Sequence, residues 1–262
     1  MSFAISGKTA IVTGAANGVG LAIARHFLEK GANVMFADMD EARLEAEVGK
    51  ADGPARFFAG DLRQKLTIAN LLSATAQAFE RVDILVNASR QVLRSDPLMT
   101  GEDGVEEMLD QNLLTSLRVS QMTARRMIAQ AGPEGQVGAI INLSSIAAQR
   151  TQPELMAYSI SCAALEQMTR SLAVALAPRR IRVNAVAIGS VLSASLQSTL
   201  KATPGYRERV IAGTPLGRIA AASELVEAVQ FLASEAAGFI TGQILTVDGG
   251  RSLLDAVAAP AH

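Results

Sequence analysis

Short runs of β-branched and apolar residues alternate along this chain with longer amphipathic stretches. The stretches have the apolar periodicity of helices and are long enough to cross over a sheet. This alternation predicts an α/β fold with a doubly wound parallel sheet and right-handed crossovers, in three α/β/α layers. The expected strands cover residues 9–13, 33–37, 56–59, 83–87, 139–143, 182–187 and 244–247, and the clearest expected helices cover 19–30, 66–80, 105–130 and 158–177.

No repeat, low-complexity segment or linker divides the 262 residues, of which 49% are hydrophobic. We therefore expect a single domain over residues 1–250. Residues 190–215 are the only long stretch without clean periodicity and are interpreted as a substrate loop. The tail, residues 251–262, is small and apolar, and the sequence leaves open whether it frays or packs on a neighbour.

Charge and composition exclude several functions. The chain has 24 basic and 25 acidic side chains, so nothing in its net charge of -1 attracts nucleic acid. Neither a membrane-spanning apolar run nor the pattern of a signal peptide is present, and the cytoplasm is the expected location. One cysteine excludes an intrachain disulfide, and two distant histidines give no reason to expect a metal.

A glycine-rich turn lies between the first expected strand and the first expected helix. Its spacing, with Gly14, Gly18 and Gly20, lets the backbone approach a pyrophosphate at the helix N-terminus. Small-residue turns also occur for packing alone, but the flanking strand and helix favour a dinucleotide site. Asn17 and Val19 belong to the same predicted cofactor contact.

An acidic residue, Asp38, ends the second expected strand. A carboxylate there can accept hydrogen bonds from the ribose hydroxyls and repel a 2′-phosphate, which favours NAD(H) over NADP(H). No basic residue near Asn17 or the adjacent Met39 argues for a phosphate. The alternative is that Asp38 or Asp40 simply caps the helix expected near Glu41.

Further motifs follow the glycine turn at Asp61-Leu62, Asn87-Ala88, Asn112, Ser144-Ser145, Tyr158 and the closing segment 247–250. Through these motifs the chain resembles the short-chain dehydrogenase/reductase family along essentially its whole length. The resemblance implies a Rossmann-like fold and a homotetramer or homodimer. It also implies adenine contacts from Asp61 and Leu62. On the nicotinamide side it implies contacts from Asn87, Ala88, Ser89, Tyr158, Ile188, Gly189, Val191 and Ser193.

The resemblance also implies a catalytic set. In such enzymes a tyrosine, here Tyr158, exchanges a proton with the substrate oxygen, and a serine, here Ser145, holds that oxygen. Asn112 would organise a water in a proton relay. Each residue taken singly also has a structural interpretation. The serine could cap a turn, the tyrosine could be a half-buried aromatic, and the asparagine could be a solvated helix residue.

The chain departs from the family motif at one position. The family has a lysine one helical turn after the tyrosine, and this chain has Cys162 there. The lysine would hold the nicotinamide ribose and lower the pKa of the tyrosine, and cysteine does neither well. Lys201 could replace it by folding back, while Cys162 itself is interpreted as a small buried apolar side chain rather than a reactive thiol. Ser89 and Ile188 also replace the family's glycine and proline.

Clues to the substrate are few. Arg90, Arg94 and Arg150 follow strand ends near the expected mouth, where they either receive an anionic substrate or are solvated surface. The apolar residues of 190–215, including Leu192, Leu196, Leu200 and Tyr206, suggest a lid.

Two functions are compatible with these residues. The first is an oxidoreductase, of reduced or specialised activity, that transfers a hydride between NAD(H) and a secondary alcohol or ketone. The alternative is a catalytically silent NAD(H)-binding protein that acts as a sensor, scaffold or inactive subunit. A non-redox reaction in the same pocket is disfavoured by the intact glycine turn.

Overall fold

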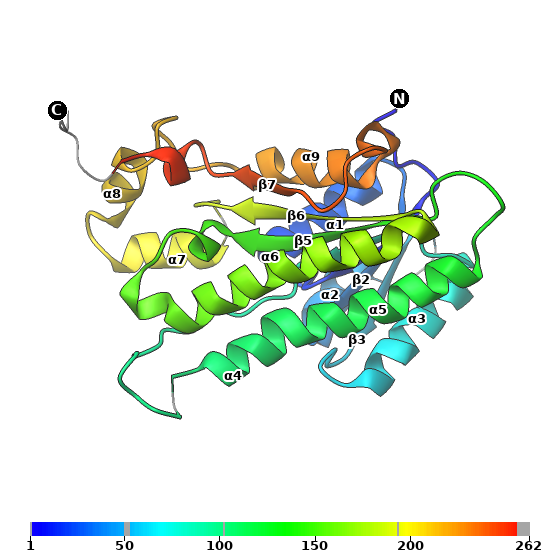
Figure 1. Cartoon of the computed structure of the whole chain (residues 1–262), viewed down its shortest axis with the longest axis horizontal. Coiled ribbons are helices and arrows are strands. Elements are labelled where there is room, and N and C mark those ends of the chain that lie inside the picture. The colour runs from blue at the N-terminus through cyan, green and yellow to red at the C-terminus, as the bar shows by residue number, and fades with distance from the viewer. Residues whose placement is uncertain (1, 50–52, 102, 193, 256–262) are drawn as a thin grey trace.

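The computed structural model describes residues 2–49, 53–101, 103–192 and 194–255, and it contains one sheet of parallel strands in the order β3-β2-β1-β4-β5-β6-β7 (Figure 1). The order reverses between β1 and β4, which opens a crevice at the carboxyl ends of these two strands. The strands are β1 (Thr9–Thr13), β2 (Asn33–Asp38), β3 (Ala55–Ala59), β4 (Ile84–Asn87), β5 (Gly138–Ser145), β6 (Ile181–Ile188) and β7 (Ile244–Val247).

Helices cover both faces of the sheet, which confirms the predicted three-layer α/β fold. One face carries α1 (Gly18–Glu29), α2 (Glu41–Val48) and α9 (Ala222–Ala233). The other carries α3 (Lys65–Phe79), α5 (Thr115–Ala129) and α6 (Met156–Leu176). Two further helices, α7 (Ala194–Ala202) and α8 (Tyr206–Ala212), lie beyond the carboxyl end of β6 (Figure 1).

The core consists of two apolar layers, one on each side of the sheet. Every residue of β1 and β6 is buried, as expected for parallel strands that helices cover on both faces. Phe27 and Phe36 pack in the layer beneath α1 and α9. Ile11 and Leu85 pack in the layer beneath α3 and α5. The sheet is therefore a rigid base for side chains at its carboxyl edge.

The structure differs from the sequence expectation at two places. The helix expected over 105–130 is divided into α4 (Val105–Met108), a π-helical segment (Leu109–Leu114) and α5. The segment 190–215, expected to be irregular, contains α7 and α8. Periodicity did not show either feature, because the π-helical segment preserves a helical pattern and α7 and α8 are short. No helix of the described chain is both long and apolar enough to cross a membrane.

Candidate active site and cofactor cleft

The turn from β1 to α1 requires glycine at several positions. Gly14 has a φ of +67°, and a Cβ there would lie 2.8 Å from the Cα of Ser89. A Cβ on Gly20 would overlap the carbonyl oxygen of Gly14. Gly18 has a φ of +58° with open space where its Cβ would be. The first two glycines therefore permit close packing, whereas the third leaves room for a ligand.

A cavity of about 470 Å³ lies against this turn, at the crevice between β1 and β4. The N-terminus of α1 faces the turn and has no acidic residue in its first turn, so its free amides and dipole favour an anion. The open side of Gly18 and this positive helix end fit the pyrophosphate of a dinucleotide. The lining brings together eight predicted cofactor residues: Gly14, Asn17, Gly18, Val19, Gly20, Asp38, Ala88 and Ser89.

The two aspartates at the end of β2 and just after it have separate roles. One oxygen of the Asp38 carboxylate accepts a hydrogen bond from the amide of Ala16 at 3.0 Å, and the other accepts from the amide of Met39 at 2.7 Å. Asp40 caps α2 by accepting from the amide of Arg43 at 3.1 Å. The capping alternative thus applies to Asp40, while Asp38 lines the cleft.

The loop after β4 is fastened to the glycine turn. The amides of Ala88 and Ser89 donate to the hydroxyl of Thr13 at 3.0 and 3.1 Å. Asn87 is buried and donates to Ser120 and Asn142, so its side chain holds the sheet and α5 together and does not line the cleft.

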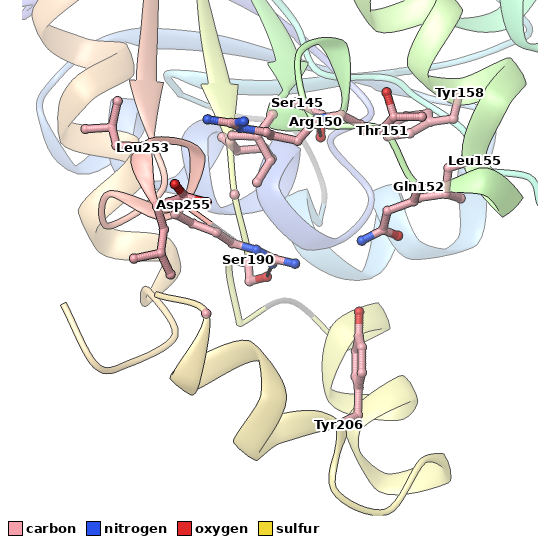
Figure 2. Close-up of a pocket in the computed structure, with 17 residues that line it drawn as sticks. Ser145, Arg150, Thr151, Gln152, Leu155, Tyr158, Ser190, Tyr206, Leu253 and Asp255 are labelled. Carbon is pink, nitrogen blue, oxygen red and sulfur yellow. Dashed lines mark hydrogen bonds between the residues drawn. The ribbon is translucent and has the colours of Figure 1, made fainter. Parts of the chain in front are cut away.

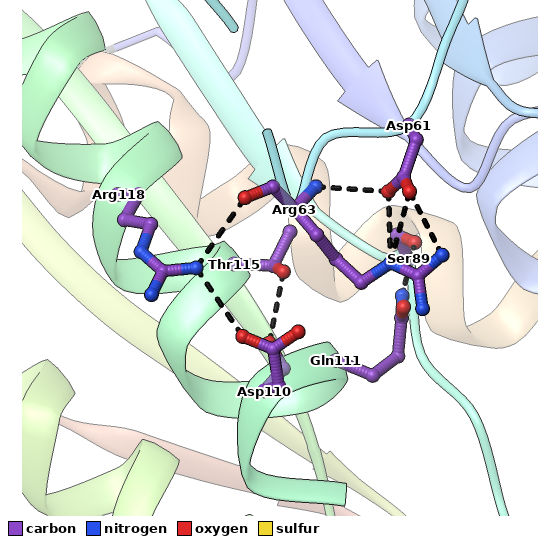
Figure 3. Close-up of polar contacts among 7 residues, drawn as sticks. All are labelled: Asp61, Arg63, Ser89, Asp110, Gln111, Thr115 and Arg118. Carbon is purple, nitrogen blue, oxygen red and sulfur yellow. Dashed lines mark hydrogen bonds and ion pairs between the residues drawn. The ribbon is translucent and has the colours of Figure 1, made fainter. Parts of the chain in front are cut away.

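Other predicted cofactor residues lie apart from the 470 Å³ cavity. Asp61 pairs with Arg63 through both carboxylate oxygens, and Arg63 lowers the pKa of that carboxyl (Figure 3). Leu62 and Val191 are buried, and Met39 is exposed. Ser193 lies outside the described residues. Ile188 and Gly189 line a second cavity.

Figure 3 also shows a contact of the Ser89 side chain. Its hydroxyl accepts from the side-chain amide of Gln111 at 3.2 Å, in the π-helical segment. Nearby, Arg118 bridges the carboxylate of Asp110 and the carbonyl of Arg63. The serine that replaces the family's glycine therefore links the cleft to the π-helical segment.

The second cavity, of about 730 Å³, opens beyond the carboxyl ends of β5 and β6 (Figure 2). Ser145 and Tyr158 lie on its wall, so the structure brings the predicted catalytic pair together. The segment after β7 contributes side chains that the sequence did not single out, including Leu253 and Asp255. Tyr206, at the start of α8, points toward Gln152 on the wall of the cavity (Figure 2). The tail thus packs against this cavity as far as residue 255, and residues 256–262 lie outside the described chain.

Tyr158 is 5% exposed, and its hydroxyl oxygen accepts a hydrogen bond from the Nη1 of Arg90 at 3.0 Å. Burial raises the pKa of Tyr158, while the charge of Arg90 and the hydroxyl of Ser145 act in the opposite direction. Cys162 is buried one turn further along α6, and burial raises the pKa of its thiol. Both side chains are therefore neutral at pH 7.

Asn112 lies in the π-helical segment and is buried, with its side chain fully engaged. Its oxygen accepts from the amide of Gln91 at 2.8 Å, and its nitrogen donates to the carbonyl of Gln91 and the hydroxyl of Ser161, each at 3.0 Å. Asn112 thus ties the loop after β4 to α6. It lines neither cavity.

The three arginines singled out from the sequence have three different environments. Arg150 lines the larger cavity. Arg94 is exposed and lies 3.5 Å from Glu154 in an ion pair. Arg90 contacts Tyr158 and lines the glycine-turn cavity, so it lies where the two cavities meet. Lys201 is exposed on α7, and none of the described interactions of Tyr158 comes from it.

A family model described as enoyl-(acyl carrier protein) reductase matches residues 14–252. This range includes the glycine turn, Ser145 and Tyr158. The chain belongs to the short-chain dehydrogenase/reductase family. It is 35% identical over 255 residues to the cis-4-hydroxycyclohexanecarboxylate dehydrogenase of Sinomonas cyclohexanicum, with 95% of this chain and 98% of that protein covered. To the NAD-dependent glycerol dehydrogenase of Listeria innocua it is 32% identical over 253 residues, with 96% of each covered.

A solved structure, that of the 7α-hydroxysteroid dehydrogenase complexed with NADH and 7-oxo glycochenodeoxycholic acid, has the same fold. It superposes with a TM-score of 0.87 at 30% identity, with 95% of each chain covered. The chain is therefore an enzyme of a family of oxidoreductases that use nicotinamide cofactors.

Proposed function

We propose that this short-chain dehydrogenase/reductase transfers a hydride between NAD(H) and a secondary alcohol or ketone, with Tyr158 and Ser145 as its catalytic residues. The observation that carries the proposal is the position of the buried Tyr158 hydroxyl. It lies on the wall of the larger cavity and is hydrogen-bonded to a residue that lines the glycine-turn cavity. A reacting oxygen in the larger cavity can thus meet a proton donor beside the cofactor cleft.

The cofactor would be held by two groups of residues. The glycine turn and the N-terminus of α1 would bind the pyrophosphate, and Asp38 would accept from the adenosine ribose. When bound, the nicotinamide would donate or accept the hydride at the substrate carbon. Asp61, Leu62, Asn87 and Met39, together with Ile188, Gly189, Val191 and Ser193, remain proposed cofactor residues through the family resemblance.

The proton steps belong to side chains of this chain. During carbonyl reduction, the hydroxyl of Tyr158 gives its proton to the substrate oxygen, and during alcohol oxidation the tyrosinate form of Tyr158 receives the proton of the alcohol. The hydroxyl of Ser145 donates a hydrogen bond to the same oxygen. Asn112, whose side chain is already occupied, is proposed to fix the loop and α6 around the tyrosine and not to bind the relay water with its amide.

We propose a preference for NAD(H), supported by the placement of Asp38. Both its oxygens accept hydrogen bonds from backbone amides, and it lines the glycine-turn cavity. Among the described residues that line this cavity, Arg90 is the only arginine or lysine. A 2′-phosphate there would meet a carboxylate. The relative from Listeria innocua is named as NAD-dependent.

We further propose that the substrate carries an anionic group. Arg150 and Arg251 line the larger cavity, and Asp255 is the one acidic residue among the described side chains of that lining. Two relatives, the dehydrogenase from Sinomonas cyclohexanicum and the 7α-hydroxysteroid dehydrogenase, are named or described with carboxylic acid compounds. A carboxylate at the far end of a cyclic secondary alcohol would suit this lining.

Two measurements test the proposal. In a fluorescence titration, NADH should bind in the micromolar range and NADPH much more weakly, and failure of both to bind would refute the cofactor assignment. Turnover of cyclic alcohols and ketones is then compared between the native chain and Cys162→Lys. For each protein, substrates that carry a carboxylate are compared with their methyl esters. We expect measurable native turnover that favours the carboxylates.

Turnover by Cys162→Lys alone would contradict an active native enzyme and support the silent NAD(H)-binding alternative. A substitution of Arg150 by glutamine should raise KM for the carboxylates and leave KM for the esters unchanged. An equal effect on both would refute the anionic substrate.

A further inference from the structure

An arginine lies at hydrogen-bonding distance from the hydroxyl of Tyr158, and it belongs to a segment remote from the helix that carries the tyrosine. The Nη1 of Arg90, in the loop after β4, lies 3.0 Å from the Tyr158 hydroxyl oxygen and 3.4 Å from the carbonyl oxygen of Ser144. Guanidinium groups remain charged at every pH that enzymes experience. A permanent positive charge therefore lies against a tyrosine whose own helix offers only the neutral Cys162 one turn away.

The arginine is held in place by contacts beside it. The backbone of its neighbour Gln91 makes two hydrogen bonds with the side chain of Asn112, at 2.8 and 3.0 Å. Asn112 also donates to Ser161, the residue before Cys162 on α6. One buried amide thus fixes the loop that carries Arg90 relative to the helix that carries Tyr158.

The contact with Arg90 limits where the proton of Tyr158 can go. An arginine N–H donates to the phenolic oxygen, because a guanidinium has no acceptor. Arg90 therefore cannot take the proton of Tyr158, and the tyrosine lines the larger cavity, where a substrate oxygen can accept it. This arrangement suits transfer of that proton to a substrate oxygen.

We propose that Arg90 is a positioning residue that supplies, from the loop after β4, the positive charge beside Tyr158 that Cys162 cannot supply from α6. The inference rests on the proposed function, because it assumes that Tyr158 exchanges the proton. Arg90 acts through the tyrosine, by stabilising its ionised form and by orienting its hydroxyl.

The other groups around the tyrosine do not replace this charge. Among the described residues, Cys162 on α6 raises the pKa of Tyr158, and Ser145 from β5 contributes a neutral hydroxyl. Glu166, deeper on α6, accepts from Ser144 at 3.0 Å and pairs with Arg170 at 3.7 Å. Arg90 is the one described cation that lowers the pKa of Tyr158.

The composition of the chain permits a direct test without cofactor or substrate. It contains two tyrosines and no tryptophan, so in a Tyr206→Phe background the tyrosinate absorbance near 295 nm reports on Tyr158 alone. Two full-length proteins, one that keeps Arg90 and one with Arg90→Gln, are titrated to alkaline pH. Far-UV circular dichroism identifies alkaline unfolding. An opposite charge at this range shifts a pKa by about 1–3 units.

We expect Arg90→Gln to raise the pKa of Tyr158 by at least about one unit, or beyond the onset of unfolding. Arg90→Lys, which keeps the charge, should restore most of the shift. Cys162→Lys should restore it in the Arg90→Gln chain by supplying a cation from α6. Arg94→Gln removes an equal charge from an exposed position close by and should leave the titration unchanged.

Equal titration of the Arg90 and Arg90→Gln chains would overturn the inference, and so would a native Arg90 chain whose Tyr158 does not ionise before unfolding. A shift of the same size in Arg94→Gln would also overturn it, because the effect would then be one of net charge. The failure of NADH to bind would refute the proposed function and leave this titration interpretable.

Discussion

At the scale of single residues, the site depends on how a buried phenol is made able to exchange a proton. Burial stabilises the neutral form of Tyr158, whereas Arg90 and Ser145 stabilise the ionised form. The balance leaves the pKa of Tyr158 above its ordinary value. The direction of the reaction then decides which form is needed.

The pH dependence of the two directions should differ. Oxidation needs the tyrosinate, which is about 0.1% of an unperturbed tyrosine at pH 7 and grows tenfold with each pH unit. Because the pKa of Tyr158 is raised, we expect the oxidation rate to climb from pH 7 to 9, while reduction, which uses the neutral hydroxyl, stays nearly flat. Initial rates at saturating cofactor measure both. An oxidation plateau below pH 8 would contradict Tyr158 as the base.

At the scale of secondary structure, the cleft depends on how closely α1 approaches β1. The turn between them packs Gly20 against the carbonyl of Gly14 and Gly14 against the backbone of Ser89. Every atom in these contacts belongs to the backbone and has little freedom to move aside. A side chain at either position would separate the strand, the helix and the loop after β4.

A Gly14→Ala substitution should therefore destabilise the fold by about 1–3 kcal/mol, the usual cost of overpacking, and weaken NADH binding. Gly49→Ala is a suitable control, because Gly49 also has a positive φ but has open space where its Cβ would be. Urea unfolding and NADH titration of the two variants separate backbone strain from the close approach. Equal losses in both would show that strain alone explains the effect.

At the scale of the whole molecule, the two cavities meet at the Arg90–Tyr158 contact but draw on different parts of the chain. The glycine-turn cavity is built from β1, the start of α1, the end of β2 and the loop after β4. The larger cavity is built from β5, β6 and the segments that follow them, with α8 and the residues after β7. Cofactor choice and proton chemistry should therefore be separable by mutation.

An Asp38→Ser substitution should narrow the preference for NADH over NADPH by about tenfold or more, since it removes one carboxylate from the ribose site. The alkaline titration of Tyr158 should stay the same, because Asp38 is not among the groups that act on the tyrosine. Paired fluorescence and absorbance titrations measure both effects. A changed tyrosine titration would show that the two cavities are coupled.

Much of this architecture follows from local sequence patterns. The expected strands at 9–13 and 244–247 have the observed bounds, and Asp38, Ser145 and Tyr158 occupy the predicted sheet edge. Periodicity could not show that Arg90 bends back to Tyr158, since that contact depends on the path of a loop fixed by Asn112. The residues after β7 were missed because only the tertiary fold brings them to the cavity.

The strand order has a consequence for how the chain folds. β1 is completed first but lies near the centre of the sheet, and its partner β4 follows only after β2, α2, β3 and α3. Ala10 pairs with Ile84, the widest separation along the chain between any two neighbouring strands. Closing so long a loop is slow relative to local pairing. During synthesis, β1, β2 and β3 can associate early, whereas the cofactor cleft must wait until the loop after β4 has left the ribosome.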